Sequence, residues 1–278
     1  MKLNSLLILH LFCSLPASYS QNYAIQGAII LTDPKIAANF DMSKLKKGQR
    51  LESKEAYLKE AQKRVATGRA FAASLPFPVQ EWWSVQTSAC PPLKRDKKMV
   101  FGKPRGNDRG VAFAHLQIWD NFLYEGRHNL SSSSSRSSEE DILVIFEDDA
   151  VSAVTNLTHS LLSELRSMDT DLLFLGWCKG PVKHFPMCTH AYAVTRKGVE
   201  KMRFHYDVCG TAIDGQFLTM CNMRWISYRK AKPENYADSL RPGADTHTTK
   251  GIVVQAKGVV SFNYHWWDPS ERNSSEPS

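Results

Sequence analysis

The stretch from Ile142 to Asp149 constrains the fold of this chain more than any other, because five apolar residues lead directly into three consecutive carboxylates. An uninterrupted apolar run of this length is typical of a strand that is buried on both faces. In open α/β sheets, ligands bind just beyond the carboxyl ends of the strands. The sequence therefore predicts an α/β fold with a polar site at Glu147, Asp148 and Asp149.

These three adjacent acids repel one another unless a cation or a basic partner lies among them. Hard divalent ions such as Mg²⁺ and Mn²⁺ bind carboxylate oxygens, and Mg²⁺ commonly takes one or two carboxylates together with substrate phosphates. We therefore expect a metal-assisted site for a phosphorylated donor. The alternative is that the acids begin a helix, whose dipole favours negative charge at that end.

The size and charge of the chain narrow the choice of partners. Its 278 residues suit one α/β domain, and a hydrophobic content of 42% is sufficient for a core. A formal net charge of +7 favours anionic partners such as nucleotides, phosphates or acidic glycans. Nucleic acid is not an expected partner, because the sequence contains no recognised nucleic-acid-binding module.

The N-terminus predicts a secretory signal peptide over residues 1–20. Lys2 precedes a mostly apolar stretch over residues 6–12, and Ser18 and Ser20 supply the small residues that a cleavage before Gln21 requires. The apolar stretch is too short to span a bilayer, and no later segment is long and apolar enough to do so. We expect a luminal protein of the endoplasmic reticulum or Golgi, or a secreted one, without a transmembrane segment. An uncleaved signal anchor is the alternative.

Sequons and cysteines agree with that compartment. Three Asn-x-Ser/Thr sequons predict glycosylation at Asn129, Asn156 and Asn273. Five cysteines remain after signal removal, and an oxidising compartment favours disulfides. The nearest pairs along the sequence are Cys178–Cys188 and Cys209–Cys221, which leaves Cys90 unpaired, although spacing alone does not establish connectivity.

Strand and helix patterns alternate along the chain, which predicts a mixed, mostly parallel sheet flanked by helices. A Ser-rich insert at 131–138 and a polar tail at 269–278 are expected to lie outside this sheet. The sequence lacks the GxxxxGK[ST], GxGxxG and GxSxG motifs, so a P-loop NTPase, a dinucleotide-binding domain and an α/β-hydrolase are not expected. Helices are predicted over 54–73, 111–123, 158–168, 196–204 and 213–222. Strands are predicted over 28–31, 79–85, 142–146, 171–176, 190–194, 225–228, 252–255 and 259–262.

Four blocks of residues, in the same order, resemble glycosyltransferase family 25, which includes bacterial lipooligosaccharide and animal procollagen galactosyltransferases. The first block resembles the family's G-x-x-x-S-H-x-x-x-W helix, and the second its hydrophobic strand ending in Glu-Asp-Asp. The third resembles its Leu-Gly…Thr-His-Ala-Tyr segment, and the fourth its short Asp-containing helix. The blocks are Gly110–Trp119, Val144–Ala150, Leu173–Gly176 with Thr189–Gly198, and Ile213–Gln216. They cover roughly residues 105–220, and the flanking regions match only loosely.

The chain also departs from the family pattern. Ala114 stands where the family usually has serine, and the Ser-rich insert precedes the acidic strand. The collagen enzymes have two transferase domains where this chain has one, and the chain ends without a KDEL-type retention signal. These departures leave the acceptor and the final compartment open, and one animal member of the family lacks detectable activity.

The resemblance implies a single GT-A-like domain over residues 21–268 that transfers a sugar, expected to be galactose, with inversion. The donor would be a UDP-sugar, the acceptor a hydroxyl of a glycoprotein or glycan, and the cofactor Mn²⁺ or Mg²⁺. Asp149 and Glu147 would bind the metal, and Asp148 would orient the donor ribose or the waters of the metal. Asp214 would be the base that inversion requires, and His190 would contact the donor or the metal.

Each of these roles has an alternative. Asp214 is equally well explained as a helix cap, and His190 and His115 as buried structural histidines. His247 and His265 are further possible metal ligands, and Trp266 with Trp267 forms either a sugar-stacking platform or a core anchor. A secreted binding module that has kept the fold and lost catalysis is the rival function. The intact acids favour the enzyme, and the lack of a second acidic cluster disfavours a two-metal phosphohydrolase.

Overall fold

The structure is a computed structural model that describes residues 24–35, 53–84, 106–129, 141–179, 186–207, 213–232 and 249–256. Several predictions fall outside these residues and stay predictions. They are the signal peptide at 1–20, the Ser-rich insert at 131–138, the strand at 259–262, the tail at 269–278, and Cys90, His247, His265, Trp266, Trp267 and Asn273.

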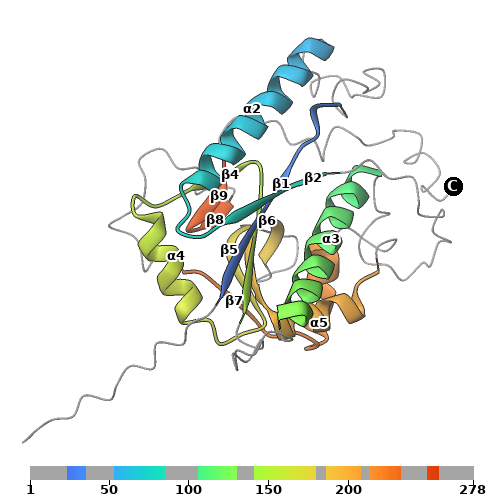
Figure 1. The fold of residues 1–278 in the computed structure, drawn as a ribbon, viewed down its shortest axis with the longest axis vertical. Helices are drawn as coiled ribbons and strands as arrows, with labels where there is room; N and C mark the ends of the chain where they lie inside the picture. Colours follow the sequence, from blue (N-terminus) through green and yellow to red (C-terminus); the bar gives the residue numbers. More distant parts are fainter. Residues whose placement is uncertain are drawn as a thin grey trace, which may run out of the picture.

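A seven-stranded mixed sheet forms the centre of the described structure (Figure 1), in the order β2-β1-β3-β6-β5-β7 with β8 also paired to β5. Strand β1 pairs in parallel with β2 and β3, and β5 in parallel with β7. The β3–β6, β5–β6 and β5–β8 pairs are antiparallel. The expected mixed α/β sheet is therefore confirmed, with parallel and antiparallel pairings equally frequent. The strands are β1 (Ile25–Leu31), β2 (Val79–Trp83), β3 (Ile142–Glu147), β5 (Leu172–Lys179), β6 (Pro186–Thr195), β7 (Tyr228–Lys230) and β8 (Thr249–Gly251).

Helices cover both faces of this sheet, because alternate side chains of its strands point to opposite sides. Leu143 and Ile145 of β3 belong to a core cluster shared with α3, α5 and α6. Val144 and Phe146 belong to a second cluster shared with α2 and α4. The helices are α2 (Lys54–Ala73), α3 (Gly106–Asn129), α4 (Leu157–Arg166), α5 (Arg196–His205) and α6 (Ile213–Asn222). None of the helices in the described ranges has the length and apolar character that a membrane span requires.

A second, two-stranded sheet lies beside the end of β3. It pairs β4 (Ala150–Ser152) in antiparallel fashion with β9 (Val253–Gln255). Gly176 of β5 permits the close approach of β9, because a Cβ atom there would lie 2.1 Å from the carbonyl oxygen of Val253. The chain segment that follows the acidic triplet is thereby held against a strand from near the other end of the chain.

Local hydrogen bonds explain where several helices begin and end. The hydroxyls of Ser53 and Thr195 accept from Ala56 and Gly198 N–H groups, so both residues cap helices. The strand predicted near 225–228 is present but begins later, because the end of α6 continues into a Schellman turn. Arg224 adopts a positive φ of 56°, and Trp225 N–H donates to the Met220 carbonyl at 2.9 Å. Strand β7 therefore begins only at Tyr228.

Of the two predicted disulfides, one is confirmed and the other is wrong. Cys178 and Cys188 form a disulfide that joins the end of β5 to the start of β6. Cys221 is instead a free, buried thiol, so the predicted Cys209–Cys221 pair is wrong. Its side chain lies on the inner face of α6 within the apolar core, where burial raises the thiol pKa to about 12 and keeps it neutral.

Candidate functional site

The acidic triplet ends β3 and divides between the two faces of the sheet. Glu147 contacts Thr189 and His115 on the face covered by α3 and α6. Asp148 contacts Arg64 of α2 on the opposite face. Asp149 follows in the turn before β4 and is 5% exposed. One short motif therefore supplies carboxylates to two different environments.

Asp148, Arg64 and Thr32 form what we call the anchored side of the site. The Arg64 guanidinium is buried and donates through Nε to Asp148 Oδ1 at 2.9 Å, with Nη2 in contact with the same oxygen. Asp148 Oδ2 accepts from the Thr32 backbone N–H at 2.7 Å. Gly68 lets α2 approach this turn, because a Cβ atom there would lie only 3.1 Å from the Asp148 Cα. Both Asp148 oxygens are therefore bonded within the protein.

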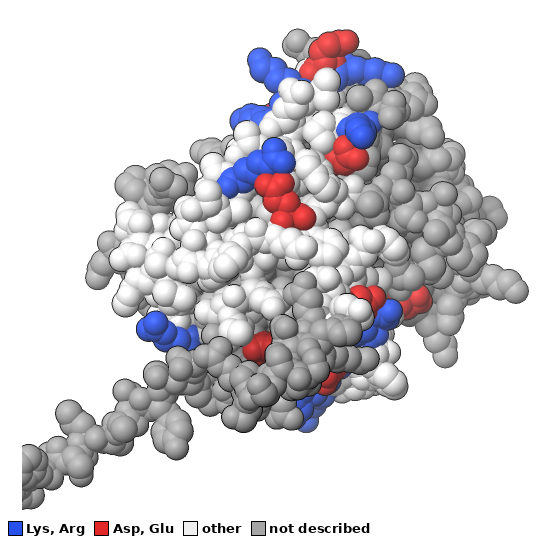
Figure 2. Space-filling model, in the orientation of Figure 1, with Lys and Arg blue, Asp and Glu red and all other residues white. Residues whose placement is uncertain are grey.

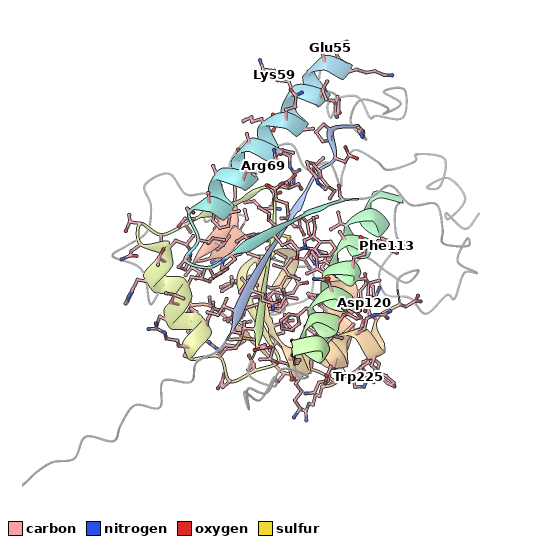
Figure 3. The ribbon with its side chains drawn as sticks, viewed as in Figure 1. Glu55, Lys59, Arg69, Phe113, Asp120 and Trp225 are labelled. Atoms are coloured by element: carbon pink, nitrogen blue, oxygen red, sulfur yellow. A yellow bond between two sulfur atoms is a disulfide. The ribbon has the colours of Figure 1, made fainter. Side chains whose placement is uncertain are left out.

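Arg64 differs from the other basic residues of α2. Lys59 and Arg69, both labelled in Figure 3, are exposed, and Arg69 forms an ion pair with Glu81 of β2 at 2.8 Å. On the face shown in Figure 2, the coloured basic and acidic side chains are interspersed and form no single-sign patch. The buried guanidinium of Arg64 is thus part of the acidic site, whereas its neighbours are ordinary surface charges.

Only one of the two carboxylate oxygens of Asp149 is hydrogen-bonded by the described residues. Its Oδ2 lies 3.3 Å from Arg64 Nη2 and accepts a long hydrogen bond of 3.3 Å from Gln255 Nε2. Its Oδ1 is buried and has no hydrogen-bond partner among the described residues. Burial raises the pKa of Asp149 to about 7; the charges of Glu147 and Asp148 add to this effect, and Arg64 opposes it. A buried carboxylate oxygen without a donor is costly, so it marks a place where a cation or ligand would be stabilising.

Glu147 forms, with Asp149 Oδ1, Asp214, His115 and His190, what we call the open side. Thr189 Oγ donates to Glu147 Oε1 at 2.7 Å, and His115 Nε2 lies 3.8 Å from the same oxygen. Burial acts to raise the pKa of Glu147, but His115 and the Thr189 hydroxyl outweigh it and hold that pKa below its usual value. Glu147 is therefore a charged carboxylate at the wall of the site.

Asp214 lies in the first turn of α6, on the Glu147 side of the sheet. One of its oxygens accepts from the Gly215 N–H at 2.8 Å. Burial raises the pKa of Asp214, the charge of Glu147 raises it further, and a hydrogen bond from the Cys188 backbone opposes the shift. The structure therefore brings the predicted base together with the acidic motif and with the disulfide loop.

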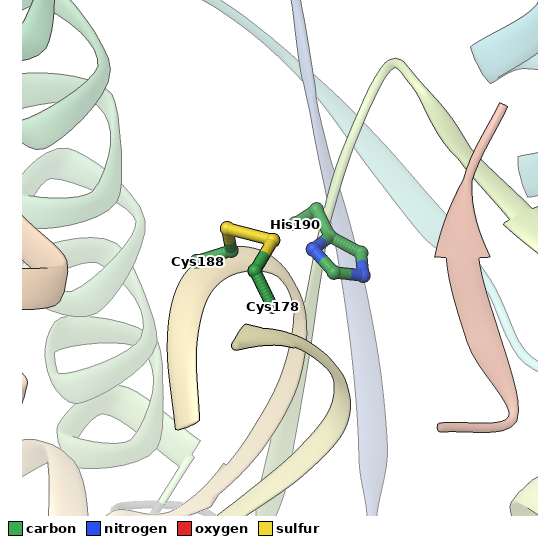
Figure 4. Close-up of side chains that lie close together, drawn as sticks. All are labelled: Cys178, Cys188 and His190. Atoms are coloured by element: carbon green, nitrogen blue, oxygen red, sulfur yellow. A yellow bond between two sulfur atoms is a disulfide. The ribbon is translucent and has the colours of Figure 1, made fainter. Parts of the chain in front are cut away.

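His190 is fully buried beside the disulfide (Figure 4). Its Nε2 lies 3.4 Å from the Val253 carbonyl oxygen, and its Nδ1 has no partner among the described residues. Burial lowers the pKa of His190, so the ring is neutral. Gly176 makes room for it, because a Cβ atom there would lie 2.3 Å from His190 Nε2.

The donor set fits a hard cation that is shared with a ligand. Cys178, Cys188 and His190 bring ligand atoms within 4.8 Å of one another, but both sulfurs belong to the disulfide and are not available to a metal. Within the described ranges, no other three such groups lie that close together. Asp149 and Glu147 would therefore hold a cation only together with ligand or water oxygens, as Mg²⁺ commonly requires.

The sequence left Arg64, Thr32, Thr189 and Gln255 unpredicted as site residues. A usable signal existed for Thr189, which begins one of the blocks that resemble the family, and for Arg64. The buried residues of α2 recur at intervals of three and four, and Arg64 occupies one of these positions among Tyr57, Ala61, Gly68 and Phe71. A charged residue in line with an apolar helix face requires a buried partner.

Comparisons with known proteins add little to this geometry. No protein-family model matches the chain, and no curated protein matches it in sequence. Among solved structures, the chain is similar to a glycosyltransferase involved in the glycosylation of the major capsid of PBCV-1. That similarity has a TM-score of 0.33 at 10% sequence identity, and it covers 86% of this chain and 98% of the other. A likeness at this level assigns no residues, so the functional argument depends on the site itself.

Proposed function

We propose that this protein is a glycosyltransferase of the family 25 type. It would transfer a sugar, expected to be galactose, from a UDP-sugar to a hydroxyl of a glycoprotein or glycan, with inversion and the help of Mn²⁺ or Mg²⁺. The observation that carries the proposal is that Asp149 Oδ1, just after the end of β3, is buried without a hydrogen-bond partner among the described residues, while the charge of Glu147 acts on the same carboxyl group. The ordered resemblance of four sequence blocks to that family supports the sugar chemistry.

Asp149 and Glu147 are the residues that would hold the cation. Asp149 Oδ1 has no hydrogen-bond partner in the described part of the chain and Glu147 is charged, so together they present hard oxygen ligands. When bound, a divalent ion would offset the charge of the departing diphosphate. The cation would also relieve the cost of burying Asp149, whose pKa of about 7 reflects burial.

Asp214 is the proposed base. It would accept the proton of the acceptor hydroxyl while that oxygen bonds to the anomeric carbon of the sugar. The bond from the anomeric carbon to the UDP oxygen breaks on the opposite side, which inverts the configuration. Burial raises the pKa of Asp214, and a carboxylate with a raised pKa is a better proton acceptor.

Asp148 and His190 are the proposed donor-binding residues. Since both Asp148 oxygens are bonded to Arg64 and Thr32, its contribution is to fix the end of β3 beside the donor. His190 Nδ1 has no partner among the residues that the structure describes, so it would be available to an oxygen of the sugar donor. Both assignments predict weaker donor binding, rather than a slower chemical step, when the side chain is altered.

Calorimetry with UDP, with and without Mn²⁺, tests the binding half of the proposal. Binding should require Mn²⁺ and should be lost in Asp149→Asn, which keeps the shape of the side chain and removes the charge. Asp120→Asn is the matched control, because Asp120 forms an exposed ion pair with Arg203 outside the site. Unchanged UDP binding in Asp149→Asn contradicts the proposal. Absence of binding under all conditions favours a binding module that has lost catalysis.

A sugar-transfer assay tests the catalytic half. Asp214→Asn should retain Mn²⁺-dependent UDP binding and lose transfer by about 100-fold or more, as expected for removal of a general base. A variant that transfers sugar at the wild-type rate excludes Asp214 as the base. UDP-galactose is the first donor to test, and collagen-like peptides and glycoproteins are the first acceptors.

We also propose that the protein functions in the secretory lumen and is glycosylated. The Cys178–Cys188 disulfide supports an oxidising compartment. Asn156 is exposed and caps α4 through its Oδ1, which leaves its amide nitrogen out of that bond. Asn129 is the last residue of α3. Mass spectrometry of the secreted protein before and after glycan removal tests occupancy at Asn129, Asn156 and Asn273.

A further inference from the structure

A chain of buried polar side chains connects α3 to Glu147. Trp119 Nε1 lies 3.1 Å from the Tyr192 hydroxyl, and His115 Nδ1 lies 2.8 Å from the same oxygen. The His115 and Tyr192 rings are stacked with centroids 5.6 Å apart. All three side chains are completely buried, so water does not reach these atoms. Their protons must therefore be placed by the residues themselves.

With a neutral His115 ring, one arrangement of protons satisfies the Trp119 indole, the Tyr192 hydroxyl and His115 Nδ1 together. The indole N–H of Trp119 is a donor and never an acceptor, so the Tyr192 oxygen accepts from it. The phenolic hydrogen of Tyr192 then has one acceptor in reach, which is His115 Nδ1. Burial raises the pKa of Tyr192 well above its usual value, so the phenol keeps its hydrogen. A neutral imidazole that accepts at Nδ1 carries its proton on Nε2.

That Nε2 proton lies beside Glu147. His115 Nε2 is 3.8 Å from Glu147 Oε1, which is longer than a hydrogen bond, so with a neutral ring the interaction is a contact between a charge and a dipole. The opposite tautomer would place the Nε2 lone pair against the carboxylate and leave the Tyr192 hydrogen without an acceptor. Both consequences are unfavourable in a buried site.

We propose that Trp119 and Tyr192 lock His115 in the Nε2–H tautomer, and that His115 is thereby a positioning residue for Glu147. Thr189 and His115 both approach Oε1, so Glu147 is oriented with Oε2 left for a ligand of the site. The residues of the G-x-x-x-A-H-x-x-x-W block on α3 thus act on the acidic motif without touching a ligand. Any effect on cation binding rests on the function proposed above, whereas the tautomer itself does not.

The first experiment measures the tautomer directly. NMR of the full-length protein with ¹⁵N-labelled histidine, at alkaline pH where imidazoles are neutral, reports which ring nitrogen of His115 carries the proton. His115→Gln identifies its signals among those of the other histidines. We expect the Nε2–H form in the wild type. A predominant Nδ1–H form, or a doubly protonated ring, overturns the proposal.

A matched pair of substitutions then tests the lock. Tyr192→Phe removes the hydroxyl, and it should release the His115 tautomer and weaken Mn²⁺ binding by about tenfold, as expected for loss of support behind a ligand. Tyr206→Phe removes a hydroxyl from a ring that also contacts Trp119, but that hydroxyl has no hydrogen-bond partner among the described residues. It should change neither measurement.

The NMR and Mn²⁺-binding measurements separate the tautomer lock from the proposed function. An unchanged His115 tautomer in Tyr192→Phe, or an equal change in Tyr206→Phe, overturns the lock. If the wild-type protein fails to bind Mn²⁺, the proposed function fails, while the His115 tautomer still decides whether the lock exists.

Discussion

The anchored side and the open side of the acidic motif differ in how completely their polar atoms are bonded. On the anchored side, Arg64 and Thr32 donate to both oxygens of Asp148. On the open side, three buried atoms have no partner among the described residues, namely Asp149 Oδ1, His115 Nε2 and His190 Nδ1. Native interiors rarely leave such atoms unbonded. The contrast separates the carboxylate that is bonded within the protein from those that we propose bind a ligand.

The largest expected effect is on the anchored side. Arg64→Met leaves Asp148 and Asp149 buried without their cation, and loss of one partner of a buried ion pair costs about 3–5 kcal/mol of unfolding free energy. Arg69→Met is the matched control on the same helix, and its exposed pair with Glu81 should contribute about 0–1 kcal/mol. Denaturant unfolding of both variants measures the difference. Equal losses would mean that Arg64 does not anchor the motif.

The disulfide that borders the open side should have the next largest effect. Replacing Cys178 and Cys188 by Ser opens a loop with a sequence separation of 10 and should cost about 2–3 kcal/mol. Thr189 and His190 follow this link directly, so UDP binding should weaken as well. A reducing agent should reproduce both changes in the wild type and have no further effect on the double variant. Full UDP binding by the reduced protein would show that UDP binding does not require the disulfide-closed loop.

The pH dependence of the unfolding free energy should reveal the raised pKa of Asp149. Its pKa in the folded protein is about 7, against an ordinary value of 3.8, because burial with Glu147 and Asp148 outweighs Arg64. The folded state thus binds this proton more tightly, so the stabilisation is present below about pH 4 and is lost as pH rises through 7. Between these limits, wild-type stability should fall relative to Asp149→Asn by about 1 kcal/mol or more.

Unfolding titrations at several pH values measure this difference between the wild type and Asp149→Asn. Mn²⁺ added at neutral pH should restore the stability of the wild type only. A constant difference across the range would show that Asp149 is not protonated on burial.

The smallest expected effect concerns Glu147. Thr189→Val removes the hydroxyl that donates to Glu147 Oε1 and should cost about 1 kcal/mol of stability, the usual value for one hydrogen bond. Thr189→Ser keeps the hydroxyl and should recover most of the loss. Thermal unfolding together with Mn²⁺ titration measures both. If Ser and Val behave alike, the hydrogen bond does not orient Glu147.

Local features of the sequence were enough to predict much of the fold. The helices over 54–73 and 213–222 have the predicted bounds. Ser53 caps the first, and the buried apolar run of β3 identified the central strand. Because the acidic residues follow that strand directly, the position of the candidate site was also predictable.

The partners of the acidic residues were not predictable, because they depend on contacts between distant segments. Arg64 and Gln255 lie 84 and 106 positions from the carboxylates that they contact. No local pattern identifies Gln255, since its position follows from the pairing of β9 with β4. Cys178 forms a disulfide with Cys188, whereas Cys221 is a free thiol. This outcome likewise depends on which segments meet in space.

Strand β9, which approaches the sheet across Gly176, follows β1, α2 and β3 in the sequence, so the surroundings of Asp149 are completed after those elements have been synthesised. The ribosome releases β1, α2 and β3 first, so Arg64 can find Asp148 while the chain is still growing. Gln255, which bonds Asp149 Oδ2, emerges more than a hundred residues later. Until then Asp149 remains open to water on that side. A nascent chain can therefore acquire its α2 anchor early, whereas the surroundings of Asp149 are completed only after β9 has emerged.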